Sequence, residues 1–239
     1  MPELAELFAE TDQIQVMTRD GKLAEAMRIA EALLFAAAEP LSETDIERRM
    51  PKGLAAATVL EALKADYAPR GVHLIRAGQK WMFRTASDLA WLLSTGQSEE
   101  KRLSRAALET LAIVAYHQPV TRAEIEDIRG VAISKGTLDL LLETGWVRLR
   151  GRRRAPGRPI TYGTTEAFLI HFGIETITDL PGLEELKGAG LLDGRLPTDF
   201  AMPQPSDDLA LAANEDPLED DAIESSSEAA LGEAEGCES

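Results

Sequence analysis

The sequence predicts a mainly α-helical fold with small β-hairpins, built as two similar domains in tandem and followed by a disordered acidic tail. Three observations lead to this prediction. Residues 32–47 (ALLFAAAEPLSETDIE) and 111–126 (LAIVAYHQPVTRAEIE) nearly repeat each other, 79 positions apart in a chain of 239 residues. Each copy is followed by a further helical segment and by a two-strand pattern. The end of the chain is acidic and poor in aromatic residues, a composition typical of disorder.

Both copies of the repeat encode a helix, a tight corner and a second helix. In each copy an apolar helix stops at a proline, and a hydroxyl residue two positions later, Ser42 or Thr121, is a suitable N-cap. Three residues further on, Asp45 or Glu124 can reach back toward the cap's own N–H, which predicts a capping box with Glu124 and an imperfect one with Asp45. A cap of this kind contributes about 1 kcal/mol.

A third helix, a hairpin and a closing helix complete each unit. The third helices are expected at 55–67 and 134–144, the second with Ser134 as its N-cap. The expected strands are 72–76 and 80–84 in the first unit, and 146–150 and 160–163 in the second. Closing helices are expected to begin near Ser87 and near Thr164 or Thr165. Three helices followed by a hairpin is the order of a winged-helix domain, so the sequence predicts two tandem winged-helix domains.

These patterns divide the chain into six parts. We expect an N-terminal extension at 1–23, a first winged-helix domain at 24–95, a linker at 96–103, a second winged-helix domain at 104–173, a C-terminal segment at 174–196 and a disordered acidic tail at 197–239.

The acidic tail accounts for most of the net charge of -16. Thirteen acidic residues and no Lys or Arg follow Leu196, and the rest of the chain is close to neutral. The tail is expected to improve solubility or to compete with nucleic acid for basic patches. Its Cys237 is the only cysteine, which excludes a disulfide framework and a cysteine-based metal site. No apolar run of about 18 residues is present to span a membrane, so a soluble cytoplasmic protein with no membrane partner is expected.

The sequence offers no catalytic constellation. The three histidines, His73, His117 and His171, have no ligand-like spacing, and no HExxH, CxxC or GxSxG motif is present. We therefore expect a protein without enzymatic activity and without a cofactor or metal.

Six arginines between positions 148 and 158 make the second hairpin the most basic part of the chain. They are Arg148, Arg150, Arg152, Arg153, Arg154 and Arg158, with no acid among them. Guanidinium groups on a loop can contact the phosphates of DNA without regard to sequence, with Arg152, Arg153, Arg154 and Arg158 as candidates. A solvated loop whose charge keeps the protein soluble or forms salt bridges with the acidic tail is an equally good interpretation.

The expected third helices do not favour sequence-specific DNA recognition. A helix that reads the major groove offers Arg, Lys, Asn or Gln. The third helix of the first unit offers Glu61, Lys64 and Asp66. The third helix of the second unit offers Lys135, Thr137, Asp139 and Glu143. A DNA-binding winged-helix transcriptional regulator is thus the alternative hypothesis rather than the main one.

Apolar residues exceed what one helix face can bury. On the third helix of the second unit, Leu138, Leu141 and Leu142 share one face, and Leu140 lies nearly opposite. On the first helix of that unit the expected core stripe is Leu108, Leu111, Ala112 and Ala115, which leaves Ile113, Val114 and Tyr116 elsewhere on the helix. In the first unit the surplus residues are Ile29, Leu33, Leu34 and Phe35. A helix that is apolar all round is covered on more than one side, by the neighbouring unit, by residues 174–192 or by a second protein.

The second unit also resembles a known family. The stretches 103–131 (LSRAALETLAIVAYHQPVTRAEIEDIRGV), 151–174 (GRRRAPGRPITYGTTEAFLIHFGI) and 179–186 (DLPGLEEL) resemble segregation and condensation protein B, ScpB. The resemblance implies a bacterial, non-enzymatic subunit of the SMC condensin complex with two winged-helix domains. It implies a homodimer that binds the kleisin ScpA, reaches the SMC ATPase through that kleisin, and acts at the nucleoid in chromosome condensation and segregation.

The family also assigns a role to each unit: the N-terminal unit dimerises, and the C-terminal unit binds the kleisin. From helix geometry we expect kleisin contact at Ile113, Tyr116, Leu140 and Trp146. The expected dimer residues are Ile29, Leu33 and Phe35. The acidic extension after Leu196 is not part of the family pattern.

Overall fold

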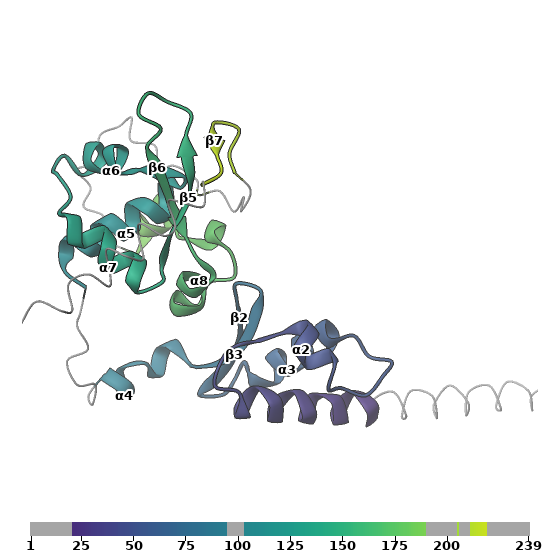
Figure 1. Cartoon of the computed structure of the whole chain (residues 1–239). Helices are drawn as coiled ribbons and strands as arrows, with labels where there is room; N and C mark the ends of the chain where they lie inside the picture. The colour runs from purple at the N-terminus through teal and green to yellow at the C-terminus, as the bar shows by residue number, and fades with distance from the viewer. Residues whose placement is uncertain (1–20, 95–102, 190–204, 206–210, 219–239) are drawn as a thin grey trace, which may run out of the picture. The chain divides into compact units, whose positions relative to one another are not determined.

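The computed structural model describes residues 21–94, 103–189, 205 and 211–218 (Figure 1). The chain divides into two compact units. Unit 1 comprises residues 1–100 and 172–175, and unit 2 comprises 101–171 and 176–239. Of the expected linker at 96–103, residues 96–102 lie outside the described residues.

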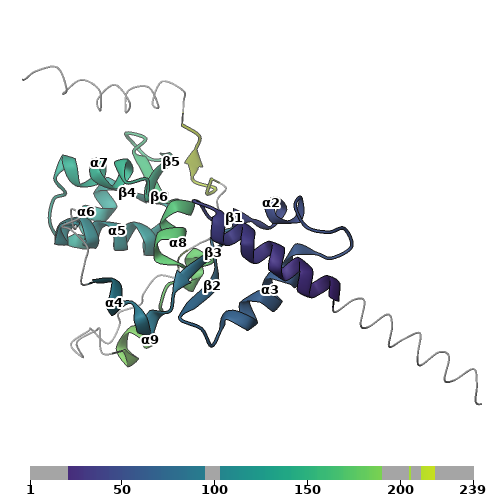
Figure 2. The same ribbon diagram turned by 90° about the horizontal axis from the view of Figure 1, so that it is seen from below.

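Unit 1 is a group of helices packed on a three-stranded antiparallel sheet. Its helices are a first helix at residues 21–36, α2 (Glu43–Glu47), α3 (Ala56–Tyr67), the 3-10 turn η1 (Ser87–Leu89) and α4 (Trp91–Ser94). Its strands β1 (Leu41–Ser42), β2 (Val72–Ala77) and β3 (Lys80–Thr85) pair in the order β1-β3-β2. The hairpin strands each extend one residue beyond the predicted range. The first helix runs alongside α2 and α3 in Figure 2.

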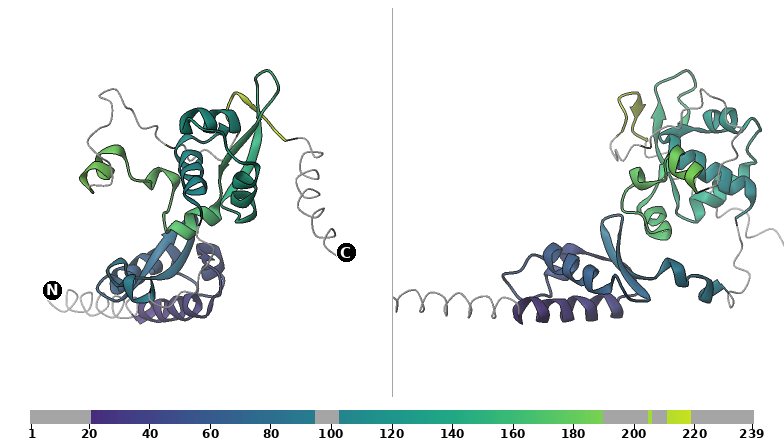
Figure 3. Two further views of the ribbon diagram at one scale, coloured as in Figure 1. Left: turned by 90° about the vertical axis from the view of Figure 1, so that its left-hand side faces the viewer. Right: turned by 180° about the vertical axis from the view of Figure 1, so that it is seen from behind.

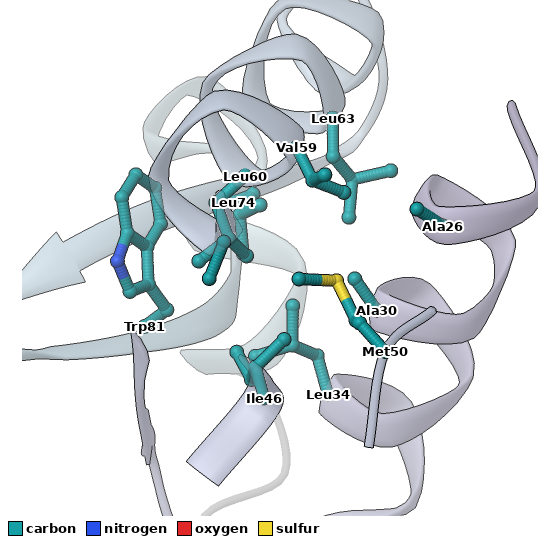
Figure 4. Close-up of a cluster of buried hydrophobic side chains, with 11 residues drawn as sticks. Ala26, Ala30, Leu34, Ile46, Met50, Val59, Leu60, Leu63, Leu74 and Trp81 are labelled. Atoms are coloured by element: carbon teal, nitrogen blue, oxygen red, sulfur yellow. The ribbon is translucent and has the colours of Figure 1, made fainter. Parts of the chain in front are cut away.

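The core of unit 1 lies between the first helix, α2, α3 and the sheet (Figure 4). Leu34, Ile46 and Leu60 come from the three helices, and Leu74 and Trp81 come from the two long strands. Trp81 is buried, and its indole Nε1 donates a hydrogen bond to Glu43 Oε1 at 3.2 Å. The large apolar area of the ring is thus removed from water while its polar atom keeps a partner.

Unit 2 repeats this arrangement with a larger sheet of four strands. Its helices are α5 (Arg105–His117), α6 (Arg122–Arg129), α7 (Lys135–Glu143), α8 (Glu166–Phe172), the 3-10 turn η2 (Ile177–Asp179) and α9 (Leu183–Gly188). Its strands β4 (Val120–Thr121), β5 (Val147–Arg153), β6 (Ile160–Thr164) and β7 (Glu215–Asp216) form a sheet in the order β4-β6-β5-β7. All neighbouring strands are antiparallel.

The helix corners form as the sequence predicts. The Thr121 side chain accepts from the Glu124 N–H, and the Glu124 carboxylate accepts from the Thr121 N–H at 2.7 Å, which completes a capping box. At the other corner Ser42 Oγ accepts from the Asp45 N–H at 3.2 Å and donates to the Asp45 carboxylate at 2.6 Å. Ser134 is the N-cap residue of α7, but its hydroxyl pairs with the Thr137 hydroxyl at 2.6 Å and makes no cap hydrogen bond to the backbone.

The core face of α5 differs from the predicted stripe. Val114 is fully buried, together with Leu111 and Ala115, whereas Leu108 and Ala112 are exposed. The real face follows Ala107, Thr110 or Leu111, and Val114 at spacings of three and four residues. This face contains small and polar residues, among them Thr110, whose hydroxyl donates to the Ala106 carbonyl at 2.8 Å. A pattern of large apolar residues therefore does not indicate it.

The acidic tail is not disordered throughout, and that part of the prediction is wrong for residues 211–218. Glu215 and Asp216 form β7, which pairs with the outer edge of β5 (Figure 1, yellow). The Glu215 side chain is buried. The composition of the tail as a whole predicts disorder. It does not indicate this short segment, because the arginines that the segment binds lie more than fifty positions earlier in the chain.

Candidate interaction surfaces

The arginine-rich hairpin of β5 and β6 is tied to α6 by Arg153. Its Nη2 donates to the two Glu124 carboxylate oxygens at 3.2 and 3.0 Å and to the Pro119 carbonyl at 2.8 Å. The pKa of Glu124 is raised by burial but lowered more strongly by the Thr121 N–H, the Thr121 hydroxyl and Arg153, so it lies below its usual value. Arg153, one of the candidate DNA contacts, therefore holds the hairpin against a helix.

The base and the tip of the hairpin also use their arginines internally. Arg148 Nε donates to the Thr164 carbonyl at 3.3 Å, and burial, followed by the nearby Arg150, lowers its pKa. At the tip Arg152 Nη1 donates to the carbonyl of Arg158 at 3.2 Å. Arg158 itself has φ of 41°, next to Gly157 at 81°, so the turn is tight.

The remaining arginines bind the tail segment. Arg150 pairs with Glu215 at 3.6 Å, Arg154 with Asp216 at 2.6 Å, and Arg158 with Asp216 at 3.5 Å. The second interpretation of the basic hairpin, salt bridges with the acidic tail, is the one observed. DNA contact at Arg152, Arg153, Arg154 and Arg158 stays a prediction, and it would require these internal bonds to be exchanged for phosphate.

Both third helices expose acidic side chains. On α7 Asp139 and Glu143 are exposed, while Thr137 is buried, contrary to the expectation that it would face solvent. On α3 the exposed charges include the Glu61–Lys64 pair at 3.8 Å. Carboxylates on this face repel phosphates, which agrees with the argument against sequence-specific DNA recognition.

The four predicted kleisin contacts are distributed unequally between core and surface. Leu140 is 38% exposed on α7, opposite the buried Leu138 and Leu141. Ile113 is half-buried. Tyr116 is half-buried and donates its hydroxyl to the Pro181 carbonyl at 2.8 Å, so residues after η2 cover its tip. Trp146 is half-buried with its ring centroid 4.2 Å from that of His171.

The predicted dimer residues also differ in their exposure to solvent. Ile29 and Leu33 are half-buried and pack against the core of unit 1. Phe35 is 86% exposed, the most exposed large apolar side chain among the described residues. A phenylalanine this exposed on a regular helix contributes little to its own unit and is available to a partner.

Helix patterning missed two further groups of exposed apolar residues. In unit 1 the short α4 exposes Trp91, Leu92 and Leu93 in succession. In unit 2 Leu108, Ile128 and Val131 are exposed on and just after α5 and α6. The Arg129–Glu109 pair at 3.2 Å ties together the helix ends on which Leu108 and Ile128 lie. A run such as WLL directly before a polar linker was the available sequence indication.

The histidines form no shared site. His171 stacks on Trp146, His117 is half-buried with its pKa lowered by burial, and His73 lies in β2 of the other unit. Among the described residues no group of three or more His, Cys, Asp or Glu could hold a metal ion. No described helix is long and apolar enough to cross a membrane.

The described residues thus define a protein of two small helical units, each with a short antiparallel sheet and exposed apolar side chains suited to protein contacts. A family model described as segregation and condensation complex subunit ScpB matches residues 28–183, and the chain belongs to this family. The match extends through elements of both units.

Individual relatives agree with this assignment. A segregation and condensation protein B homolog of Coxiella burnetii is 38% identical over 164 residues, which cover 66% of this chain and 78% of the relative. Segregation and condensation protein B of Clostridium tetani is 44% identical over 165 residues, covering 66% and 86%. The crystal structure of ScpB from Mycobacterium tuberculosis is 32% identical over 64% of this chain and 97% of its own, with a TM-score of 0.29. The family assignment therefore rests on the sequence matches.

Proposed function

We propose that this protein is a non-enzymatic scaffold subunit of a bacterial SMC–kleisin condensin complex. In this proposal it acts as a homodimer of winged-helix domains that binds the kleisin ScpA, and through it the SMC ATPase, in chromosome condensation and segregation during cell division. The family match carries the proposal, because it spans residues 28–183 and so extends through both units. Its place of action is the cytoplasm, at the nucleoid.

The kleisin surface is proposed on unit 2. Leu140 is the centre of this surface, because it is exposed on a helix whose opposite face is buried. A leucine in that position does not stabilise its own unit by burial, and an apolar anchor of this kind is what a partner helix needs. Ile113, Tyr116 and Trp146 are half-buried, so they support the surface with part of each side chain.

The dimer surface is proposed on unit 1. Phe35 offers a full aromatic ring, and aromatic residues are enriched at the centres of interfaces. Leu33 lies two residues and Ile29 six residues earlier on the same helix, and both pack on the core, so they fix the helix from which Phe35 projects. The exposed α4 residues Trp91 and Leu93 are further candidates for this surface.

The experiment for this function is gene replacement in the bacterium that encodes the protein. Deletion is expected to produce cells without DNA and decondensed nucleoids, and the wild-type gene is expected to restore both. A gene carrying Leu140→Glu should fail to restore them, while Ala123→Glu, a change at an exposed alanine of α6, should succeed. Normal nucleoids in the deletion strain would contradict the proposal.

A further inference from the structure

The outer edge of β5 carries a second, separate contact surface. β7 pairs with it in antiparallel register, with Arg152 opposite Asp216 and Arg153 opposite Glu215. The Arg154 N–H donates to the Asn214 carbonyl at 2.8 Å, which continues the pairing toward the tip of the hairpin. Figure 3 shows this segment beside the hairpin of unit 2. The backbone of the segment is thus held as an added strand.

Side chains select an acidic sequence at this edge. Glu215 is inserted fully, with a side-chain exposure of 0%, and pairs with Arg150, whose side chain is 5% exposed. Asp216 lies between Arg154 and Arg158. A buried carboxylate requires a cation as its partner, and Arg150 of this hairpin supplies it.

The shape of the edge also fits an added strand. Gly151 lies within the arginine run, and a Cβ there would lie 2.5 Å from the Asp216 carbonyl oxygen and 2.8 Å from Leu211 Cδ2. Both atoms belong to the tail segment. Glycine at 151 therefore leaves the room that a neighbouring backbone needs.

The segment also makes hydrogen bonds within itself. The Glu215 N–H donates to the Ala212 carbonyl at 2.8 Å, and the Ala212 N–H donates to the Glu215 carboxylate at 2.8 Å. These two bonds close a turn that presents Glu215 and Asp216 together. A short acidic segment with this turn is a self-contained ligand for the edge of β5.

We propose that the outer edge of β5 is a binding site for an acidic, extended protein segment with a Glu-Asp pair. Residues 211–218 occupy this site in the free protein, and an acidic strand of a partner protein exchanges with them. Occupation by the chain's own segment keeps the edge closed against unselected strands. The surface is distinct from the exposed apolar residues proposed above for the kleisin and for the dimer, and it does not depend on that function.

The test uses the full chain with its own segment displaced. The double substitution Glu215→Lys and Asp216→Lys places cations against Arg150, Arg154 and Arg158, so the segment leaves while the site itself stays unchanged. The probe is a fluorescent synthetic peptide of residues 209–219, and its anisotropy is measured with the wild type and with the open variant. The open variant is expected to bind the peptide about tenfold or more tightly than the wild type, because two charge-assisted contacts become available.

Two controls separate strand recognition from simple charge attraction. Adding Gly151→Ala to the open variant should reduce peptide binding about tenfold, because the new Cβ occupies the strand's position. Adding Gly136→Ala, where nothing lies within 4 Å of the new Cβ, should leave binding unchanged. A peptide of scrambled order and equal charge should bind weakly to the open variant.

Any of four results would overturn the proposal. Equal peptide binding by the wild type and the open variant would mean that the segment does not occupy the site. Scrambled peptide binding as tightly as the native order would reduce the site to a charged patch. Binding of labelled duplex DNA but not of the peptide to the open variant would assign the edge to phosphate. In the wild type alone, an Arg154 amide that exchanges with solvent at an unprotected rate would also contradict the pairing with Asn214.

Discussion

Arg153 of β5 donates two hydrogen bonds, of 3.0 and 3.2 Å, to the carboxylate of Glu124 on α6. The two residues lie 29 positions apart in the chain. Glu124 at the same time completes the N-cap of α6. One carboxylate thus fixes the helix corner and the basic hairpin together. An arginine that the sequence marks as a DNA contact is used to build the unit.

This relationship predicts that Arg153 contributes to stability. Arg153→Met keeps the aliphatic stem and removes the bonds to Glu124 and to the Pro119 carbonyl, so unit 2 should lose about 1–2 kcal/mol. Urea unfolding followed by circular dichroism measures the loss. Arg105→Met is the control, because its partner Glu109 pairs with it on an exposed helix surface, and it should cost measurably less. Equal losses would contradict a structural role for Arg153.

A second carboxylate makes unit 2 sensitive to acid. The pKa of Glu126 is lowered, first by the Ile133 N–H that donates to it at 3.0 Å and then by Arg122. A carboxylate with a lowered folded pKa stabilises the fold above its unfolded value of about 4.5, and this stabilisation is lost as the pH falls further through the folded pKa. Glu126→Gln should therefore be less stable than the wild type at pH 7, and the difference should shrink below pH 4.5. A difference independent of pH would contradict this linkage.

Neighbouring leucines on α7 should separate folding from binding. Leu141 is fully buried and Leu140 is 38% exposed. Leu141→Ala should cost about 2–5 kcal/mol of unfolding free energy, because it leaves a cavity. Leu140→Ala should change stability by about 0.5 kcal/mol or less. In kleisin titrations by calorimetry the folded Leu140→Ala should bind about tenfold more weakly, as expected for an apolar anchor. Unchanged affinity would exclude Leu140 from the interface.

The proposed dimer can be tested at Phe35. Phe35→Glu places a charge on an 86% exposed side chain, so folding should be preserved while the dimer dissociates at micromolar concentration. Ala24→Glu, at an exposed alanine about three turns earlier on the same helix, is the control and should remain dimeric. Sedimentation velocity distinguishes the two species. A Phe35→Glu protein with the wild-type sedimentation coefficient would refute this choice of surface.

Local patterns predicted most of the secondary structure. Ser42 and Thr121 as caps, and the β-branched and aromatic strands around Gly78, depend on neighbours within a few residues, which a sequence displays directly. The prediction of the core face of α5 was wrong. Thr110 is buried with its hydroxyl bonded to a carbonyl of its own helix, and Leu108 is exposed. Which face packs inward is decided by elements that lie far away in the chain.

The surfaces were predicted only in part. Phe35 and Leu140 are exposed as helix geometry suggested, whereas Ile29 and Leu33 pack on the core of their own unit. The pairing of Glu215 with Arg150 could not be predicted, because it joins positions 65 residues apart through a strand of two residues. Gly151 within the arginine run was the one local indication that a backbone approaches there.

The central claim is that the chain is a dimeric scaffold that binds a kleisin. The most direct measurement is size-exclusion chromatography with light scattering on the full chain, alone and mixed with the kleisin of the same organism, at about 150 mM salt. We expect a dimer that takes up the kleisin into one stable peak and keeps it when the salt is raised, because apolar anchors are not screened. A protein that elutes unchanged in the presence of the kleisin would contradict the account.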